Sequence, residues 1–459
     1  MRHLPRPLVL PILISLLAAR AAWAQPVIAP DADPRVAQLV ASVSQERLRT
    51  LATTLVSFGT RETMSTTTSP TRGIGAARQW IMDELKRSSP RLQVSFDTHV
   101  IAPQGRITRQ TELRNVMAVL PGRTARRIYI TGHYDSLNLG AGGQQARNTS
   151  GGAAATGQES AAFDHDADAN GANDDGSGTV LTMELARVFA ESGLQFDATL
   201  VFMCWAGEEQ GLIGSAAHAQ ALAAQKIAIE ANLNNDIVGN SRGGNGVIDA
   251  ETVRIYSVGP EDSMSRSLAR YVARVAAIYV PSHRIRLMAR EDRFGRGSDH
   301  SSFTKQGFPA VVFREANENF SKQHTAADTI DGVDFAYLAQ NARVNAAVAA
   351  SIALAPPAPS VVNERGANLL TRGTSGYDAE LKWNASPGAV AYRVYWRDTW
   401  TNDWQHRQTI GNATSFVLPN VSIDDFVFGV AAVGADGHES LVSAYVSPVR
   451  QSADVKTVK

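Results

Sequence analysis

Five short stretches of the chain carry histidine or acidic residues where a strand is predicted to end or where a loop follows it. They read GHYDS (132–136), NDDGSG (173–178), GEEQGLIGS (207–215), NNDIVG (234–239) and QHTAADT (323–329). Their chemistry-bearing side chains are His133, Asp135, Asp174, Glu208, Glu209, Asp236 and His324. A single polar residue at a strand end is usually a helix cap or a solvated side chain, so the inference depends on the combination.

That combination is typical of a metal-dependent hydrolase. Two histidines and three carboxylates can hold two divalent ions that share one carboxylate, and imidazole with carboxylate favours zinc. Asp135 lies two residues after His133, so on a strand it points the same way and can accept the other ring N–H of that histidine. Of the adjacent Glu208 and Glu209, one can bind metal while the other serves as the general base.

The elements between these stretches alternate between strands and helices. Strand-like sequences cover 92–101, 114–122, 127–136, 198–209, 230–239 and 310–316, and helical patterns cover 34–59, 73–87, 176–193 and 331–355. The alternation predicts an α/β sandwich. In such a fold the loops at the strand ends carry the site.

The last hundred residues follow a different period. The stretch APPAPS (355–360) predicts a linker, and short alternating strands over 361–459 predict a small all-β sandwich. An early Trp383 and the strand around Tyr392, Val394 and Tyr395 resemble a fibronectin type III module. We expect this module to be a spacer or to bind a polymer or a cell surface.

The first residues predict export. A positive start, a short apolar run and the sequence AAWAQ indicate a signal peptide over 1–24, which leaves a first mature domain over 25–354. The mature protein is then expected in the periplasm or outside the cell. No later segment has about 18 uninterrupted apolar residues, so we expect no membrane span. The formal net charge of +0 argues against nucleic-acid binding, and the single cysteine excludes an intramolecular disulfide.

Taken in order, the five stretches resemble peptidase family M28, the co-catalytic zinc aminopeptidases, over about residues 50–350. The resemblance implies a mixed, mostly parallel sheet flanked by helices, a peptide substrate with a free N-terminus, and two zinc ions. It implies that His133 and Asp236 hold one zinc, that Glu209 and His324 hold the other, and that Asp174 bridges them. Asp135 would support His133, Glu208 would be the general base, and a cis peptide would follow Asp174.

One position departs from the family pattern. Gln323 stands where family aminopeptidases often carry a tyrosine that helps to polarise the scissile carbonyl. The stretch RFGRGSDHSSF (293–303) resembles the family's pocket loop. Its residues Arg293, Arg296, Asp299 and His300 are candidate substrate contacts, although a solvated loop is an equally good interpretation.

Two other functions fit the same scaffold. A catalytically inactive relative would bind peptides or other ligands, but it should have lost ligands or the base, and all of them are present. A one-zinc aminoacyl cyclase would not need the full second set of ligands. A serine hydrolase is excluded because GNSRG (239–243) is not followed by a helical sequence, and the chain has no His-Glu-x-x-His.

An acidic stretch before the second motif offers a calcium alternative. DHDADANG (164–171) matches the first half of a calcium loop, but Ser177 stands where the loop needs a glutamate. An accessory calcium on Asp164, Asp166 or Asp168 is therefore a secondary expectation, and a solvated acidic loop is the simpler interpretation.

Overall fold

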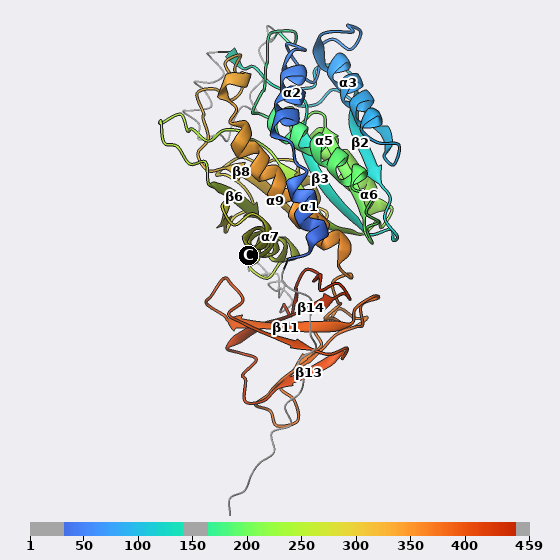
Figure 1. Ribbon diagram of the computed structural model, residues 1–459, viewed down its shortest axis with the longest axis vertical. Helices are drawn as coiled ribbons and strands as arrows, with labels where there is room; N and C mark the ends of the chain where they lie inside the picture. The colour runs from blue at the N-terminus through green and yellow to red at the C-terminus, as the bar shows by residue number, and fades with distance from the viewer. Residues whose placement is uncertain (1–31, 141–163, 447–459) are drawn as a thin grey trace, which may run out of the picture.

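The computed structural model describes residues 32–140 and 164–446. Within them, helices surround a large sheet, and a smaller group of strands lies beyond one end of it (Figure 1). The predicted signal peptide and nearly all of the glycine-rich stretch 139–162 lie outside the described residues. No helix in the described part is long and apolar enough to span a bilayer.

The large sheet has eight strands and mixed direction, as expected. In spatial order they are β1 (Gln93–Ile101), β2 (Thr111–Leu120), β4 (Thr199–Trp205), β3 (Arg127–His133), β5 (Ile229–Asn235), β8 (Ala310–Glu315), β6 (Thr252–Ser257) and β7 (Arg284–Met288). The central strands β4, β3, β5 and β8 are mutually parallel. Their carboxyl ends therefore meet at one edge of the sheet.

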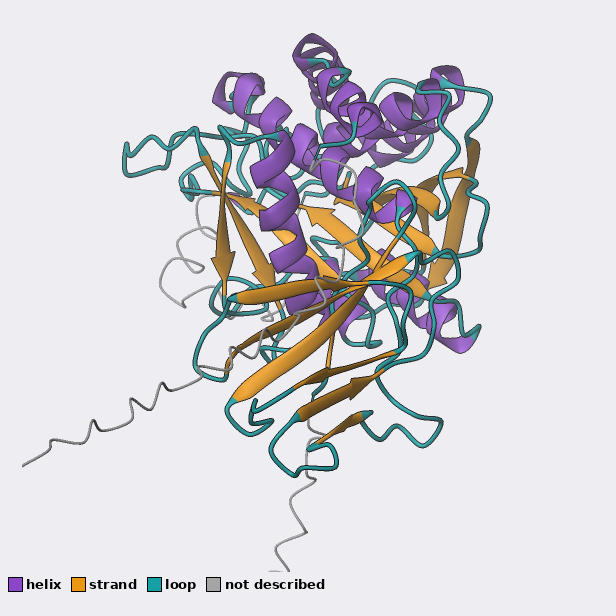
Figure 2. Cartoon of the chain, turned by 60° about the horizontal axis from the view of Figure 1, so that its bottom comes forward, coloured by secondary structure: helices purple, strands orange, loops and turns teal. Residues whose placement is uncertain are grey.

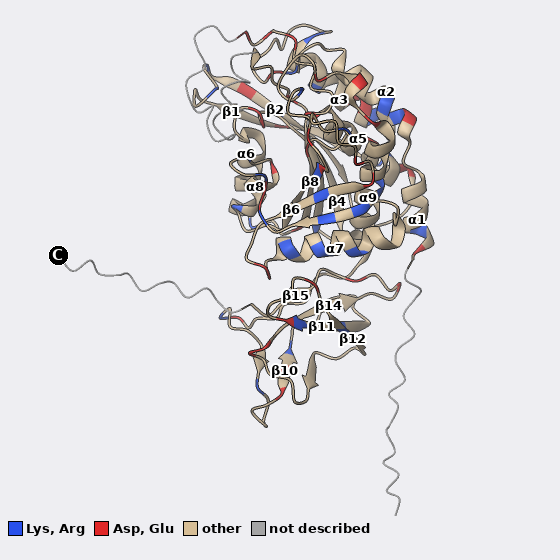
Figure 3. Cartoon of the chain, turned by 90° about the vertical axis from the view of Figure 1, so that its left-hand side faces the viewer, with Lys and Arg blue, Asp and Glu red and all other residues tan. Residues whose placement is uncertain are grey.

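Helices cover both faces of the sheet. One layer holds α1 (Pro34–Ala41), α2 (Gln45–Val56), α3 (Gly73–Ser88), α5 (Gly176–Glu191), α7 (Met264–Tyr279) and α9 (Phe335–Leu354), and the other holds α6 (Ile213–Ala224) and α8 (His300–Thr304). Figure 3 shows α6 and α8 across the sheet from α5 and α9. Alternate residues of β4 join the two cores: Phe202 faces the first layer and Met203 the second. Both faces of the central strands are thus buried, as their unbroken apolar sequences predict.

The helical pattern over 34–59 forms two helices rather than one. The chain breaks between α1 and α2, where the Ser44 hydroxyl accepts a hydrogen bond from the Arg47 backbone N–H and caps α2. The Ser44 N–H in turn donates to the buried Glu184 carboxylate of α5. A serine that caps one helix and anchors it to another therefore outweighs the continuous apolar spacing.

The C-terminal residues form a small all-β part, as predicted (Figure 2). One sheet has the order β13 (Ser415–Leu418), β10 (Ala379–Lys382), β9 (Leu370–Thr371), and the other has β12 (His406–Ile410), β11 (Ala391–Asp398), β14 (Phe426–Val433), β15 (Ser443–Ala444). Trp383 and Tyr392 pack in the core between these sheets. The likeness to a fibronectin type III module, like the domain boundaries, stays a prediction.

Glu439 is a buried carboxylate through which the small β part contacts α7. Glu439 accepts hydrogen bonds from Tyr395 (2.6 Å), Arg274 of α7 (2.6 Å) and Arg393. Burial raises the pKa of Glu439, but Arg274 and Arg393 outweigh it and hold that pKa below its usual value. The Tyr271 hydroxyl of α7 donates to the Glu439 carbonyl (3.0 Å). The β part is therefore fixed to the helix layer and does not hang on a free tether.

This docking surface lies away from the candidate residues. β6 runs antiparallel to β8, so the segment that follows β6 lies at the edge where β8 begins. Asp262 in that segment forms an ion pair with Arg397 of β11. The Arg126 side chain, just before β3, donates to the Ala355 carbonyl at the start of the 355–360 segment (2.8 Å). The small β part thus attaches at the amino ends of the parallel strands, opposite their carboxyl ends.

Replacing Glu439 should loosen this attachment. In Glu439→Ala, Arg274 and Arg393 lose the carboxylate that they pair with. We expect the free energy of unfolding at pH 7 to fall by about 3 kcal/mol. This is the low end of the range for a broken buried pair, because both arginine side chains are partly exposed to solvent. Because the folded pKa is lowered, this stability exists above the unfolded value of about 4.3 and is lost as pH falls further. Urea unfolding at pH 7 and pH 3 measures both effects. Asp424→Ala, which removes an exposed pair with Arg372, is the control and should cost less than about 1 kcal/mol.

Candidate metal centre

Five of the sequence-predicted residues meet at the carboxyl edge of the parallel strands. His133 ends β3, Asp236 follows β5, Glu209 follows β4, Asp174 lies in the loop before α5, and His324 lies in the loop after β8. They form two groups that could each hold a metal ion, His133–Asp174–Asp236 and Asp174–Glu209–His324. Within each group the ligand atoms all lie within 4.8 Å of one another.

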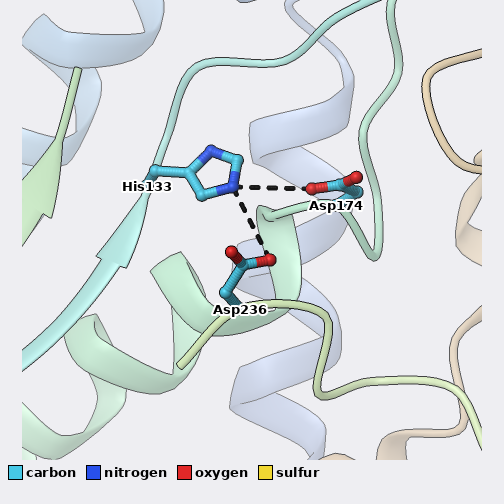
Figure 4. A group of neighbouring side chains, drawn as sticks. All are labelled: His133, Asp174 and Asp236. Atoms are coloured by element: carbon cyan, nitrogen blue, oxygen red, sulfur yellow. Dashed lines mark ion pairs between the residues drawn. The ribbon is translucent and has the colours of Figure 1, made fainter. Parts of the chain in front are cut away.

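Asp174 belongs to both groups. Its Oδ1 lies 3.5 Å from His133 Nε2, and its Oδ2 lies 3.0 Å from His324 Nε2. His133 Nε2 also lies 3.8 Å from Asp236 Oδ1, as Figure 4 shows, and His324 Nε2 lies 3.2 Å from Glu209 Oε1. Since each oxygen of Asp174 faces a different histidine, this carboxylate can bridge two cations.

The unsatisfied atoms of the cluster fit metal ions. Three of its buried atoms, one in each of three residues, make no hydrogen bond within the described part of the chain: His133 Nε2, Asp174 Oδ2 and Glu209 Oε1. Buried polar atoms are almost always paired, and an unpaired one costs about 1–3 kcal/mol. Imidazole nitrogen and carboxylate oxygen are zinc's preferred ligands besides thiolate. The residues present therefore fit two zinc ions.

The electrostatics of the cluster show a shortage of positive charge. Burial, with the charges of Asp174 and Glu208, holds the pKa of Glu209 well above its usual value. For Asp174 burial also raises the pKa, but the two histidines His324 and His133 outweigh it and hold that pKa well below the usual value. Two imidazoles therefore cannot neutralise every acid in the cluster, and divalent cations would supply the missing charge.

Glu208 borders both groups without belonging to either. Its Oε2 lies 4.0 Å from His133 Nε2, and its side chain is 13% exposed, against 3% for Glu209. Burial raises the pKa of Glu208 to about 7, and the nearby acids add to the shift although His133 opposes it. The two adjacent glutamates therefore occupy different environments, as their predicted split of roles requires.

Asp135 supports the glutamates as well as His133. The His133 ring Nδ1 hydrogen-bonds the Asp135 backbone carbonyl (3.1 Å), whereas the carboxylate lies 3.6 Å away, beyond hydrogen-bond range. The carboxylate instead accepts the backbone N–H groups of Glu208 (3.2 Å) and Glu209 (3.1 Å) and the Thr63 hydroxyl (3.0 Å). Its closest contacts thus fix the two glutamates, a link that the spacing of the sequence did not reveal.

Two further aspartates hold the bridging residue. A cis peptide joins Asp174 to Asp175, at the position that the family resemblance implied. The Asp328 carboxylate accepts the N–H groups of Asn173 (3.1 Å) and Asp174 (2.9 Å). The Asp175 carboxylate accepts the N–H groups of His133 (3.0 Å), Gly178 (2.9 Å) and Ile237 (3.2 Å). Neither aspartate was predicted to have a role at the site.

Asp236 has a buried cationic partner. Arg314 of β8, with a side chain 0% exposed, places its Nη1 2.8 Å from Asp236 Oδ1 and its Nη2 2.9 Å from Asp292 Oδ2. The Ser298 hydroxyl donates to Asp236 Oδ2 (2.5 Å). The sequence carries a signal for this pairing: Arg314 lies inside the apolar stretch AVVFREA, and a buried charge needs a counter-charge.

The candidate substrate residues fall into two sets. The buried Glu318 carboxylate accepts hydrogen bonds from three of them: Arg293 (2.6 Å), Gln323 (3.1 Å) and Arg296 (3.3 Å). Arg296 also donates to the Gln323 side-chain oxygen (3.2 Å). This network adjoins His324 along the chain. Asp299 and His300 are 0% exposed, and His300 bonds the carbonyl of Glu291. A substrate contact at any of these five residues stays a prediction.

The acidic loop lies outside the cluster. Asp164, Asp166 and Asp168 are exposed, Asp168 pairs with Arg72 (2.8 Å), and Asp166 accepts the Thr66 N–H (3.0 Å). In residues 32–140 and 164–446 only the two groups around Asp174 have the geometry for a metal ion. An accessory calcium ion at this loop stays a prediction.

Comparison with known sequences agrees with the cluster. The sequence profile of peptidase family M28 matches residues 115–349, which include every ligand candidate. This chain belongs to peptidase family M28. A "Probable zinc metalloprotease" of Pyricularia oryzae is 37% identical over 90% of this chain and 84% of its own, and one of Pyrenophora teres is 36% identical over 89% and 86%. The protein is therefore a peptide hydrolase, and its family implies zinc.

Solved structures share the fold. The M28 protein resembles the LapA aminopeptidase of Legionella pneumophila, with TM-score 0.52 and 20% identity over 70% of this chain and 75% of that one. It also resembles the glutaminyl cyclase of Porphyromonas gingivalis, with TM-score 0.51 and 16% identity over 67% and 98%. At these identities the likeness concerns the fold alone.

Metal removal should reveal the charge shortage. We expect zinc at a hundred times its dissociation constant to stabilise the metal-stripped protein by about 2.7 kcal/mol per site, visible as a higher midpoint of thermal unfolding. Asp174→Asn should lose most of this gain, because it removes the carboxylate that belongs to both groups. Asp168→Asn, outside the cluster, should respond to zinc as the wild type does. An equal zinc response in Asp174→Asn would contradict the assignment.

Proposed function

We propose that this M28 protein is an exported aminopeptidase that removes the N-terminal residue of peptides at a two-zinc site. The observation that carries the proposal is the position of Asp174, whose two oxygens face two different histidines. In this proposal His133 and Asp236 would hold one zinc, Glu209 and His324 would hold the other, and Asp174 would be shared by both. A single metal ion would use only one of the two groups of ligand atoms.

The chain's own residues then divide the work. Bound zinc would polarise the scissile carbonyl and lower the pKa of a water molecule. Glu208 takes the proton of that water and returns it to the leaving amine, a role suited to the more open of the two glutamates. The Asp135 carboxylate accepts hydrogen bonds from the backbone N–H groups of Glu208 and Glu209. It therefore holds the proposed base and the neighbouring proposed ligand in place.

The free amine of the substrate fits the charge of the site. Glu208 and Asp236 lie around His133 at the carboxyl edge of the sheet, and their negative charges attract an ammonium group. A blocked N-terminus carries no such charge. This argument favours an exopeptidase over an endopeptidase.

The remaining parts of the proposal concern the rest of the chain. We infer that residues 1–24 are removed on export, that the peptidase domain spans 25–354, and that 361–459 form an accessory module. Its attachment opposite the site, through Glu439 and Asp262, suits a module that binds a polymer or surface without blocking the substrate.

Replacing the base should separate chemistry from metal binding. We expect Glu208→Gln to lower kcat by about 10²–10⁴-fold, the usual contribution of a general base, while the protein keeps two zinc ions per chain. Kinetics on an aminoacyl-nitroanilide and elemental analysis of the same sample measure both. Glu230→Gln, at a glutamate paired with Arg126 at the far end of β5, is the matched control and should keep its kcat. Loss of zinc in Glu208→Gln would make Glu208 a ligand instead.

Substrates whose N-terminal amine is blocked test the exopeptidase assignment. We expect N-acetylated nitroanilides and peptides to be hydrolysed about 10²-fold or more slowly than their free-amine counterparts, because only the latter offer an ammonium group to the acidic site. Equal rates on free and blocked substrates would contradict the proposal.

A cyclase remains the second candidate, since the fold is shared with a glutaminyl cyclase. Mass spectrometry of a peptide with N-terminal glutamine decides between the two. An aminopeptidase releases free glutamine and shortens the peptide by one residue. A cyclase leaves the peptide at full length and removes ammonia from it.

A further inference from the structure

Arg61 connects two of the backbone segments that carry candidate metal ligands. It lies between α2 and α3, and it is 1% exposed. Its guanidinium donates three hydrogen bonds: Nε to the carbonyl of Tyr134 (2.6 Å), Nη1 to that of Asn170 (2.7 Å) and Nη2 to that of Gly171 (2.8 Å). Tyr134 directly follows the ligand His133, and Gly171 opens the loop that presents Asp174.

We propose that Arg61 is a positioning residue that sets the spacing between His133 and Asp174 and so keeps the zinc site assembled before metal arrives. The inference rests on the function proposed for this site. The planar guanidinium holds its N–H groups at fixed angles, so three carbonyls bound to it are fixed relative to one another. Outer residues that orient metal ligands typically change metal affinity when they are replaced.

The backbone of Arg61 reinforces the same connection. Its N–H donates to the Ser136 hydroxyl (3.0 Å), and its carbonyl accepts the Ser136 N–H (3.2 Å). The Ser136 hydroxyl donates in turn to the Ala169 carbonyl (2.7 Å). Three segments that are distant in sequence are thus joined at one point directly behind the ligands.

Gly171 allows the close approach that this connection needs. Its φ is +49°, in the left-handed region, and a Cβ there would lie 2.9 Å from Arg61 Nη2 and 2.7 Å from Ser136 Cβ. A larger residue would therefore push the guanidinium away from the loop. The space for Arg61 is built into the loop of Asp174.

The surroundings of Arg61 explain why a cation is tolerated there. The guanidinium donates its hydrogen bonds to three backbone carbonyls. Burial lowers the pKa of Arg61 to about 10, and the nearby charges of Asp328, Asp135, Asp175 and Asp174 oppose that change. The side chain therefore stays charged at neutral pH and offsets part of the repulsion among the acids.

Arg61 lies outside residues 115–349, the part that matches the family profile. The segment that supplies it also supplies Thr63, whose hydroxyl donates to Asp135. The proposal therefore gives the α2–α3 segment a place in the metal centre.

Arg61→Lys tests the proposal, because it keeps the positive charge and removes the planar guanidinium that donates to three carbonyls at once. We expect zinc affinity, measured by competition with a chromogenic chelator, to fall about 10- to 100-fold, and kcat to return towards the wild-type value when zinc is in excess. Arg91→Lys is the matched control: Arg91 also donates to two backbone carbonyls, of Ala190 (2.9 Å) and Leu194 (2.6 Å), at the far end of α5. Its zinc affinity should match the wild type.

The outcomes separate this proposal from the one it rests on. Unchanged zinc affinity in Arg61→Lys, or an equal loss in Arg91→Lys, would overturn the role of Arg61. Failure of the wild type to bind zinc would overturn the proposed function instead. If Arg61→Lys does not fold, Ser136→Ala removes the other part of the connection. It should weaken zinc binding measurably, by up to about 10-fold. An unchanged zinc affinity in this variant would count against the proposal.

Discussion

The structure is organised around the crowding of buried negative charge at one edge of its sheet. Asp174, Glu209 and Asp236 lie within a few ångströms of two imidazoles, with almost no access to solvent. Buried like charges repel strongly, because little water remains to screen them. Such a cluster persists only if cations or hydrogen-bond donors compensate it, and the surrounding residues serve that purpose one by one.

The compensation comes from elements that are distant in sequence. Arg314 reaches Asp236 from β8, and Arg61 approaches the acids from the segment between α2 and α3. The backbone N–H groups of Asp174 and Glu209 donate to two further carboxylates, of Asp328 and Asp135, which hold these two residues in place. The fold therefore carries two kinds of residue at the site: candidate ligands at strand ends and in adjoining loops, and supports that hold those segments at fixed distances.

This division explains what the sequence could predict. The candidate ligands were predictable because histidine and carboxylate recur together at five predicted strand ends or adjoining loops, and parallel strands bring those ends together. Arg61 was not, because an arginine that donates to backbone carbonyls leaves no pattern of spacing. The break between α1 and α2 depended on Ser44 and Glu184, which are far apart in sequence. The docking of the small β part likewise depends on Glu439 and Arg274, whose pairing exists only after both parts fold.

The same contacts make the two metal groups unequal. Asp236 already faces the guanidinium of Arg314 and accepts a hydrogen bond from Ser298, so part of its charge is offset before any metal binds. Glu209 faces His324 and the bridging Asp174, and both Asp174 and Glu208 raise its pKa further. The group with Glu209 therefore presents the less compensated charge to an incoming cation. Since Asp174 belongs to both groups, a cation that binds to one of them also changes the charge that the other presents, so the two positions are coupled through a single carboxylate.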